Sequence, residues 1–138
     1  MNHPEPEHQF ILPLYIHTTK KKRKGLGQSL SMNNLLYKHR EHVRKIKQAY
    51  QKNLYSGLDV ISQMNWPIDI RYTIFPKYKS DLGNYGSMID KFFLDALVQR
   101  NRIPDDNYDY VKRIVFEFGE KQFHSPHCVA TIRKYQEW

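Results

Sequence analysis

The stretch that decides the fold runs from Asp81 to Asp106 and reads DLGNYGSMIDKFFLDALVQRNRIPDD. It opens with a carboxylate and an amide three residues apart, and it closes with two adjacent carboxylates after a proline. The apolar segment between them has the spacing of a helix. If the chain turns back after this helix, the two acidic clusters can meet. Oxygen ligands arranged in this way are what hard divalent cations prefer.

Ser87 to Asp90 have a capping-box pattern, so the sequence predicts a helix from Ser87 to about Val98. Lys91 and Asp95 are four residues apart on this helix and are expected to pair with each other. The buried face is predicted to consist of Ile89, Phe92, Phe93, Ala96 and Leu97. Residues 101–104 then turn the chain back.

Four strands are predicted outside this stretch, over residues 10–16, 68–75, 111–118 and 128–133. Pro13 lacks a backbone donor, which predicts that the first strand is at an edge or interrupted. A long amphipathic helix is expected from about residue 34 to 54, ending just before Gly57. Its apolar stripe would be Leu36, Val43, Ile46, Tyr50 and Leu54.

These elements predict an α+β fold, with a small mixed sheet of about four strands and two main helices. The third and fourth strands are expected to pair as a hairpin. Residues 1–9 would form a flexible tail, and residues 10–138 a single domain.

Positive charge is concentrated in one part of the chain, whose formal net charge is +8. Residues 17–52 contain eleven Lys and Arg and one acid, Glu41, whereas residues 53–138 contain eleven of each sign. This distribution favours a polyanionic partner, although a solvated basic helix with no ligand has the same composition. The basic loop 17–31 carries five consecutive bases and two glycines, so it cannot pack as a core.

The candidate DNA-binding residues are mainly basic. They are Lys20, Lys21, Lys22, Arg23 and Lys24 in the basic loop, Arg40 and Arg44 on the long helix, and Lys77 and Lys79 in the basic loop after the second strand. Asn84 would either position a phosphate oxygen or hold its own loop.

The single cysteine, Cys128, excludes an internal disulfide framework and a cysteine-based zinc site. The sequence shows no apolar run long enough to span a membrane and no signal peptide, so we expect a soluble, cytoplasmic protein.

A bound Mg²⁺ ion, or Mn²⁺ as an alternative, would activate water for phosphodiester hydrolysis. Asp81 on one side and Asp105 or Asp106 on the other would form a partial cage for it. Lys91 would stabilise charge that develops at the phosphate. The same acids also suit structural roles, because Asp81 can cap a turn and the pair after Pro104 can form a surface turn.

The order of these residues resembles the RusA family of Holliday junction resolvases, small homodimeric endonucleases of phages and prophages. The family pattern is roughly Asp-x-Asp-Asn, Lys, Asp-Ala-Leu and Ile-x-Asp-Asp. The corresponding segments here are Asp81-Leu-Gly-Asn84, Lys91, Asp95-Ala96-Leu97 and Ile103-Pro-Asp105-Asp106. The similarity covers about residues 81–118, and elsewhere it is one of layout.

The resemblance implies paired, Mg²⁺-dependent cuts in four-way DNA junctions by a two-fold homodimer, without a small-molecule cofactor. It implies metal-binding roles for Asp81 and Asp106, a catalytic role for Lys91 and a supporting catalytic role for Asp105.

Two features depart from the family pattern. Gly83 stands where the family has its second acid, and four additional residues separate Asn84 from Lys91. Asp90 can replace the missing acid as a third metal ligand. Alternatively, the metal uses fewer protein ligands, or the protein no longer cuts DNA. The competing functions are therefore an impaired relative that binds branched DNA, and a regulatory protein-interaction module on the same fold.

Overall fold

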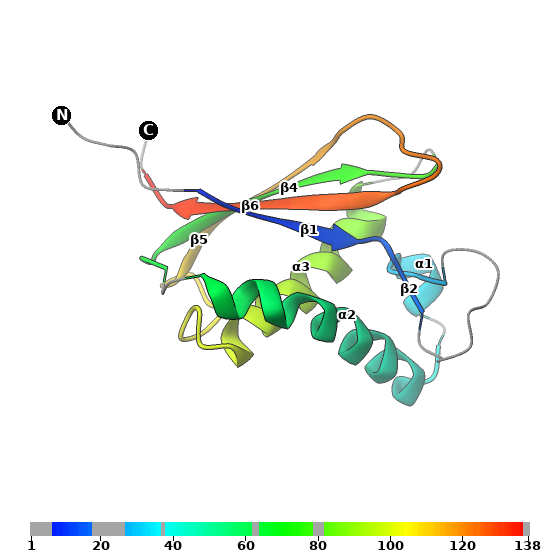
Figure 1. The fold of residues 1–138 in the computed structure, drawn as a ribbon, viewed down its shortest axis with the longest axis horizontal. Helices are drawn as coiled ribbons and strands as arrows, with labels where there is room; N and C mark the ends of the chain where they lie inside the picture. The colour runs from blue at the N-terminus through cyan, green and yellow to red at the C-terminus, as the bar shows by residue number, and fades with distance from the viewer. Residues whose placement is uncertain (1–6, 18–26, 37, 62–63, 79–81, 137–138) are drawn as a thin grey trace.

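A computed structural model describes residues 7–17, 27–36, 38–61, 64–78 and 82–136. Figure 1 shows a four-stranded sheet with the two long helices on one of its faces, which confirms the predicted α+β class. The elements, in chain order, are β1 (His8–Pro13), β2 (Tyr15–Ile16), β3 (Gln28–Ser29), α1 (Met32–Leu35), α2 (Arg40–Val60), β4 (Ile68–Phe75), α3 (Leu82–Gln99), β5 (Val111–Phe118) and β6 (His127–Lys134).

The strand order in the main sheet is β1-β6-β4-β5. β4 and β5 are parallel and are connected through α3, whereas β6 is antiparallel to both β4 and β1. The predicted hairpin of the third and fourth strands is therefore wrong, because β4 lies between β5 and β6. A parallel pair needs a crossover such as α3, and this crossover leaves the other edge of β4 free for β6.

The first predicted strand is both at an edge and interrupted. β1 pairs only with β6 in the main sheet, and the chain then leaves that sheet at Leu14. β2 and β3 form a separate two-stranded sheet. Both alternatives drawn from Pro13 are thus confirmed.

The predicted long helix is divided in two. α1 ends at Leu35, and α2 begins after His39, whose Nδ1 accepts a hydrogen bond from the Glu41 backbone N–H at 3.2 Å. α2 continues past Gly57, which was predicted to follow the helix end. Leu36 was placed in the apolar stripe but is 62% exposed, because it lies in the break between the helices.

α3 begins at Leu82, five residues before the predicted start at Ser87. The predicted start rested on the capping-box pattern of Ser87 to Asp90. Gly86 permits a close approach of the helix to β5, because a Cβ at this position would lie 2.9 Å from the ring of Phe116. Packing against the sheet therefore outweighs the low helix propensity of glycine here.

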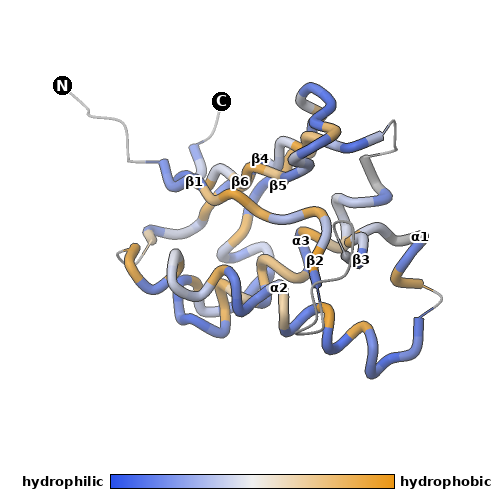
Figure 2. Tube along the Cα trace, turned by 45° about the vertical axis from the view of Figure 1, so that its right-hand side comes forward, coloured by the Kyte–Doolittle hydropathy of each residue, from blue (hydrophilic) through white to orange (hydrophobic). Residues whose placement is uncertain are grey.

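The core lies between the helices and the sheet, and Tyr50, Tyr72, Phe92 and Phe93 are its largest fully buried side chains. The Tyr50 and Phe92 rings connect α2 to α3 with centroids 5.7 Å apart, and Tyr72 stacks on Phe116 at 5.3 Å. Figure 2 shows hydrophobic and hydrophilic residues alternating along α2, as expected for a helix with one buried face.

Within the described residues, no helix combines the length and the apolar composition that crossing a membrane requires.

Candidate active site

Asp90 is the acidic residue of α3 that points toward the sheet. Its Oδ1 accepts a hydrogen bond of 2.7 Å from the hydroxyl of Tyr72, in the middle of β4. The Tyr72 side chain is fully buried, so its hydroxyl needs a partner inside the protein. This bond fixes the Asp90 carboxylate at the boundary between the core and the solvent.

The environment of Asp90 disfavours its negative charge. Burial raises its pKa above the ordinary value of 3.8, the hydrogen bond from Tyr72 opposes this shift, and the negative charge of Asp106 raises the pKa further. Asp106 belongs to the turn before β5, so acids from two separate segments contribute negative charge to the surroundings of Asp90. A bound divalent cation would offset this charge, and carboxylates are the ligands that such a cation prefers.

Asp105 and Asp106, the two adjacent acids in the turn before β5, have different hydrogen-bond partners. Asp105 accepts hydrogen bonds from the Asp106 backbone N–H at 2.8 Å and from the Asn107 side chain at 3.2 Å. Its two carboxylate oxygens thus hold the turn together, as the structural interpretation of this pair predicted. Asp106 is exposed and acts electrostatically on Asp90, so it is the better candidate ligand.

Asn84 and Lys91 lie on one side of α3, because seven residues correspond to about two helical turns. Lys91 is exposed and thus accessible to a phosphate. The predicted Lys91–Asp95 pair is not formed. Asp95 instead forms an ion pair with Lys47 of α2, because that helix packs across α3 at this level.

Several predicted residues lie outside the described part of the chain. They are Asp81, Lys79 and the basic residues Lys20, Lys21, Lys22, Arg23 and Lys24. In the part of the chain that the structure describes, no three His, Cys, Asp or Glu side chains gather as a metal site. The described portion of the candidate metal site is therefore the pair Asp90 and Asp106.

The remaining predicted DNA contacts lie on two elements. Arg40 and Arg44 are exposed on the first turns of α2, where Arg44 forms an ion pair with Glu41 at 2.7 Å. Lys77 follows β4, and its ammonium group lies over the rings of Tyr78 and Phe123. These cations can contact phosphates without base specificity.

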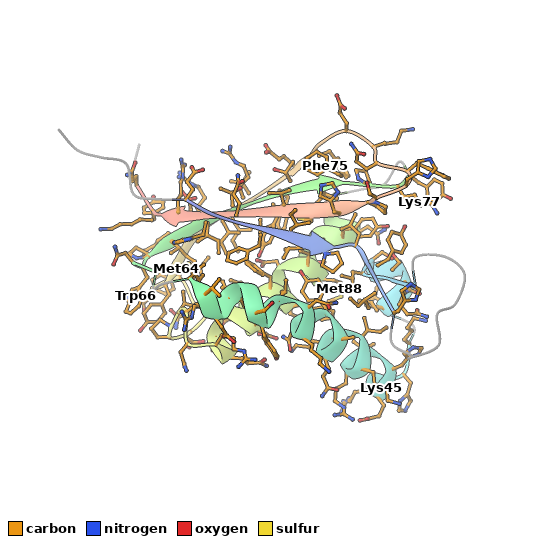
Figure 3. All side chains as sticks on the ribbon, in the orientation of Figure 1. Lys45, Met64, Trp66, Phe75, Lys77 and Met88 are labelled. Carbon is orange, nitrogen blue, oxygen red and sulfur yellow. The ribbon has the colours of Figure 1, made fainter. Side chains whose placement is uncertain are left out.

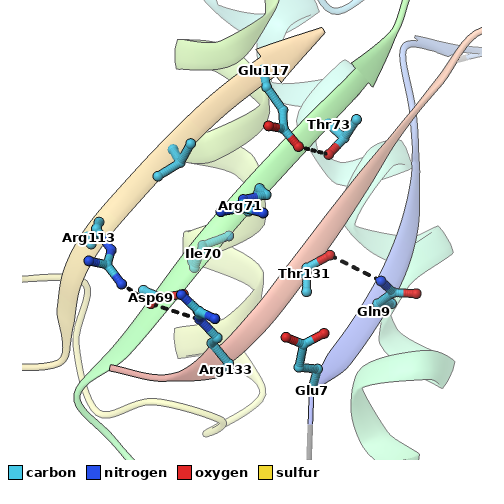
Figure 4. A pocket seen from close by; sticks show the side chains of 11 residues that line it. Glu7, Gln9, Asp69, Ile70, Arg71, Thr73, Arg113, Glu117, Thr131 and Arg133 are labelled. Carbon is cyan, nitrogen blue, oxygen red and sulfur yellow. Dashed lines mark hydrogen bonds and ion pairs between the residues drawn. The ribbon is translucent and has the colours of Figure 1, made fainter. Parts of the chain in front are cut away.

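The face of the sheet opposite the helices carries a pocket of about 330 Å³ (Figure 4). At its base, the buried Asp69 accepts hydrogen bonds from Arg113 at 2.8 Å and from Arg133 at 3.1 Å. This network was not predicted from the sequence. Strand alternation put Asp69 on the polar face, but only the register places Arg113 of β5 and Arg133 of β6 on either side of it.

Tyr72 was also missed, because it was interpreted only as an apolar strand residue. Its hydroxyl was the available signal, since a buried tyrosine usually has a hydrogen-bond partner. Cys128 is fully buried, and burial raises the pKa of its thiol to about 12, so it remains protonated.

Compared with models of known protein families and with curated proteins, the chain matches none of them.

Proposed function

We propose that this chain is a Mg²⁺-dependent endodeoxyribonuclease that cuts four-way DNA junctions, or related branched DNA, by paired nicks. One observation carries the proposal. Asp90 is fixed by a buried tyrosine at 2.7 Å, and the charge of Asp106 acts on it from another segment. Carboxylates whose pKa is raised by burial and by neighbouring charge are frequent at catalytic and metal sites, which supports this assignment.

Each candidate site residue would have a separate role in phosphodiester hydrolysis. Asp90 and Asp106, with Asp81, would hold the ion, which supplies an activated water and offsets charge on the phosphate. Tyr72 keeps the Asp90 carboxylate oriented. Lys91 is exposed and half-buried Asn84 lies two turns earlier on the same side of α3, so both would contact the phosphate that is cut.

Charge distribution supports DNA as the substrate. Arg40 and Arg44 are exposed at the start of α2, and the +10 segment of residues 17–52 includes them. Such cations contribute affinity that is independent of sequence. This is appropriate for an enzyme that recognises the shape of branched DNA.

A branched-DNA-binding protein without nuclease activity is the second candidate. It is favoured by the presence of only two potential ligands, Asp90 and Asp106, in the described part of the site. The two candidates differ in one measurement, which is metal-dependent cleavage of a labelled four-way junction by the purified chain.

The decisive experiment incubates this junction with Mg²⁺, with Mn²⁺ and with EDTA. Symmetric nicks that require the metal support the nuclease. Tight binding without nicks supports the second candidate. Binding that does not weaken with added salt contradicts both, because phosphate contacts release counterions.

Asp106→Asn tests the metal assignment. We expect cleavage to fall at least about 10³-fold, while junction binding is kept or tightened because one negative charge is removed. Asp109→Asn is the matched control, because Asp109 is another exposed acid of the same turn. Full activity of Asp106→Asn would show that this residue is not a ligand.

The proposal includes a two-fold dimer, because a four-way junction has two-fold symmetry and needs two equivalent cuts. Light scattering is expected to give twice the chain mass of 16.7 kDa. A monomer that makes paired nicks would contradict this part of the proposal.

A further inference from the structure

An aromatic cluster lies at the end of the sheet where β4 and β5 finish. It consists of Lys77 and Tyr78 after β4, and Phe123 and His124 in the connection between β5 and β6. Tyr78 is 60% exposed and Phe123 is 54% exposed. Because these two exposed rings lie next to each other, they form an apolar patch that can take a ligand.

The four side chains contact one another. The Tyr78 and Phe123 rings meet edge to face with centroids 5.9 Å apart, and His124 meets Phe123 at 5.1 Å. The Lys77 ammonium lies 5.2 Å from the Tyr78 ring and 4.9 Å from the Phe123 ring. The cluster therefore presents two exposed ring systems with a positive charge held beside them.

Backbone bonds fasten the two loops that carry the cluster. The Gln122 N–H donates to the carbonyl of Pro76 at 2.8 Å, and the Gly119 N–H donates to that of Ile74 at 2.8 Å. Gly119 is required here, because a Cβ would lie 2.3 Å from the ring of Phe75. The rings thus stand on loops that are already ordered, which lowers the entropic cost of binding.

We propose that Tyr78 and Phe123 are a stacking site for an unpaired nucleobase, with Lys77 contacting the adjacent phosphate. Every base has a π-face, so stacking tolerates any sequence, and a cation beside the rings attracts the backbone. A small cationic ligand fits less well, because the Lys77 ammonium near both rings would repel it. The inference rests on the proposed DNA substrate and refines it to DNA with unpaired bases at the branch.

The position of the cluster agrees with this role. α3 starts at the same end of the sheet, since it follows β4, and Asp90 is eight residues from its first residue, about 12 Å along its axis. The cluster therefore lies at the end of the sheet from which α3 leads to Asp90.

The opposite end of the sheet provides a matched control. Tyr108 is 74% exposed and lies under the ammonium group of Lys112 at 4.9 Å, so it has the same chemistry. It precedes β5, and its neighbour Tyr110 contacts Trp66. Figure 3 labels Trp66 and Lys77 at opposite ends of the sheet.

The test measures binding of the full chain to a labelled oligothymidine of about 20 nucleotides and to a blunt duplex, by fluorescence anisotropy. Tyr78→Ala and Phe123→Ala are each expected to weaken single-strand binding roughly 5- to 100-fold, with little change for the duplex. Tyr108→Ala should change neither by more than about twofold. Phe123→Leu keeps apolar volume without an aromatic face, so it should resemble Phe123→Ala.

Salt dependence separates the rings from the cation. Lys77→Gln should reduce the slope of log affinity against log salt by about 0.7, whereas the ring variants should leave this slope unchanged. Single-strand binding that is equal in Phe123→Ala and Tyr108→Ala would overturn the stacking site, and so would restored binding in Phe123→Leu. Equal losses for the single strand and the duplex would also overturn it, and a protein ligand would then be the better explanation of the cluster.

The two proposals can fail separately. Ring-dependent single-strand binding without junction cleavage rejects the nuclease and keeps the stacking site. Junction cleavage by a chain whose single-strand binding does not depend on Tyr78 and Phe123 keeps the nuclease and rejects the stacking site. A wild-type chain that binds no DNA rejects both.

Discussion

Asp69 is buried and Asp90 is half-buried, but the charges that surround the two carboxylates differ in sign. Asp69 lies on the open face of the sheet, and two arginines neutralise it at 2.8 and 3.1 Å. Asp90 lies on the helix side, where a neutral tyrosine hydroxyl bonds to it and Asp106 repels it. The comparison teaches that burial alone does not indicate function. A satisfied charge stabilises the fold, whereas an unsatisfied charge is available for a ligand.

The largest expected effect is the loss of junction cleavage when Asp90 is changed. Asp90→Asn should reduce junction cleavage about 10³-fold, because an amide cannot replace a carboxylate at a cation. Asp69→Asn should leave the rate per folded molecule within about threefold, because Asp69 lies on the other face of the sheet. Single-turnover cleavage of a labelled junction measures both. Equal losses in the two variants would remove the distinction between the acids.

The next largest effect is the loss of stability when Asp69, which pairs with two arginines, is changed. Asp69→Ala should lower the free energy of unfolding by about 3 kcal/mol, since it leaves Arg113 and Arg133 without their shared partner. Urea unfolding of the full chain measures the change. Glu117→Ala removes an exposed acid from the same pocket and should change stability by no more than about 0.5 kcal/mol. A small effect at Asp69 would mean that water replaces the network without cost.

A smaller change is expected from the hydroxyl that holds Asp90. Tyr72→Phe should raise the Mg²⁺ concentration needed for half-maximal cleavage about tenfold, because the Asp90 carboxylate loses its orienting donor. Tyr50→Phe is the control, since the Tyr50 hydroxyl is buried with no hydrogen-bond partner among the described residues. A metal requirement that shifts equally in both variants would point to general loosening of the core.

The smallest effect is the pH dependence of stability at Asp90. A carboxyl whose pKa is raised on folding stabilises the fold fully only below its unfolded value, and this contribution is lost as pH rises through the folded pKa. Asp90→Asn should therefore match the wild type near pH 3.8 and become the more stable of the two toward pH 7, within about 1 kcal/mol. Thermal unfolding across this range, without metal, measures the difference. A variant that becomes less stable as pH rises would contradict the sign.

Several elements could be predicted because their signal is local. β5 occupies the predicted residues 111–118, and β4 occupies the predicted residues 68–75. In both, apolar and polar residues alternate with the strand period, and this depends only on neighbours in the chain. The helix with the Asp-Ala-Leu motif was predicted for the same reason, although its first turns were missed at Gly83 and Gly86.

The candidate site was harder to predict, because its contacts are not local. Asp90 was proposed as a replacement ligand, but nothing in the sequence identified Tyr72 as its donor, eighteen residues away. The proposed Lys91–Asp95 pair followed the rule for neighbours on one helix. In the structure, Asp95 instead forms an ion pair with Lys47, which lies forty-eight residues away on α2.

By itself, the sequence determined the class of fold, the period of β4, β5 and the core of α3, and the separation of basic from acidic segments. Each of these depends on residues within a few positions of one another or on composition alone. Only the tertiary structure decided that β6 lies beside β4, that Asp69 pairs with two arginines and that Tyr72 donates to Asp90. These outcomes depend on strand register and helix packing, which bring distant residues together and which no local pattern encodes.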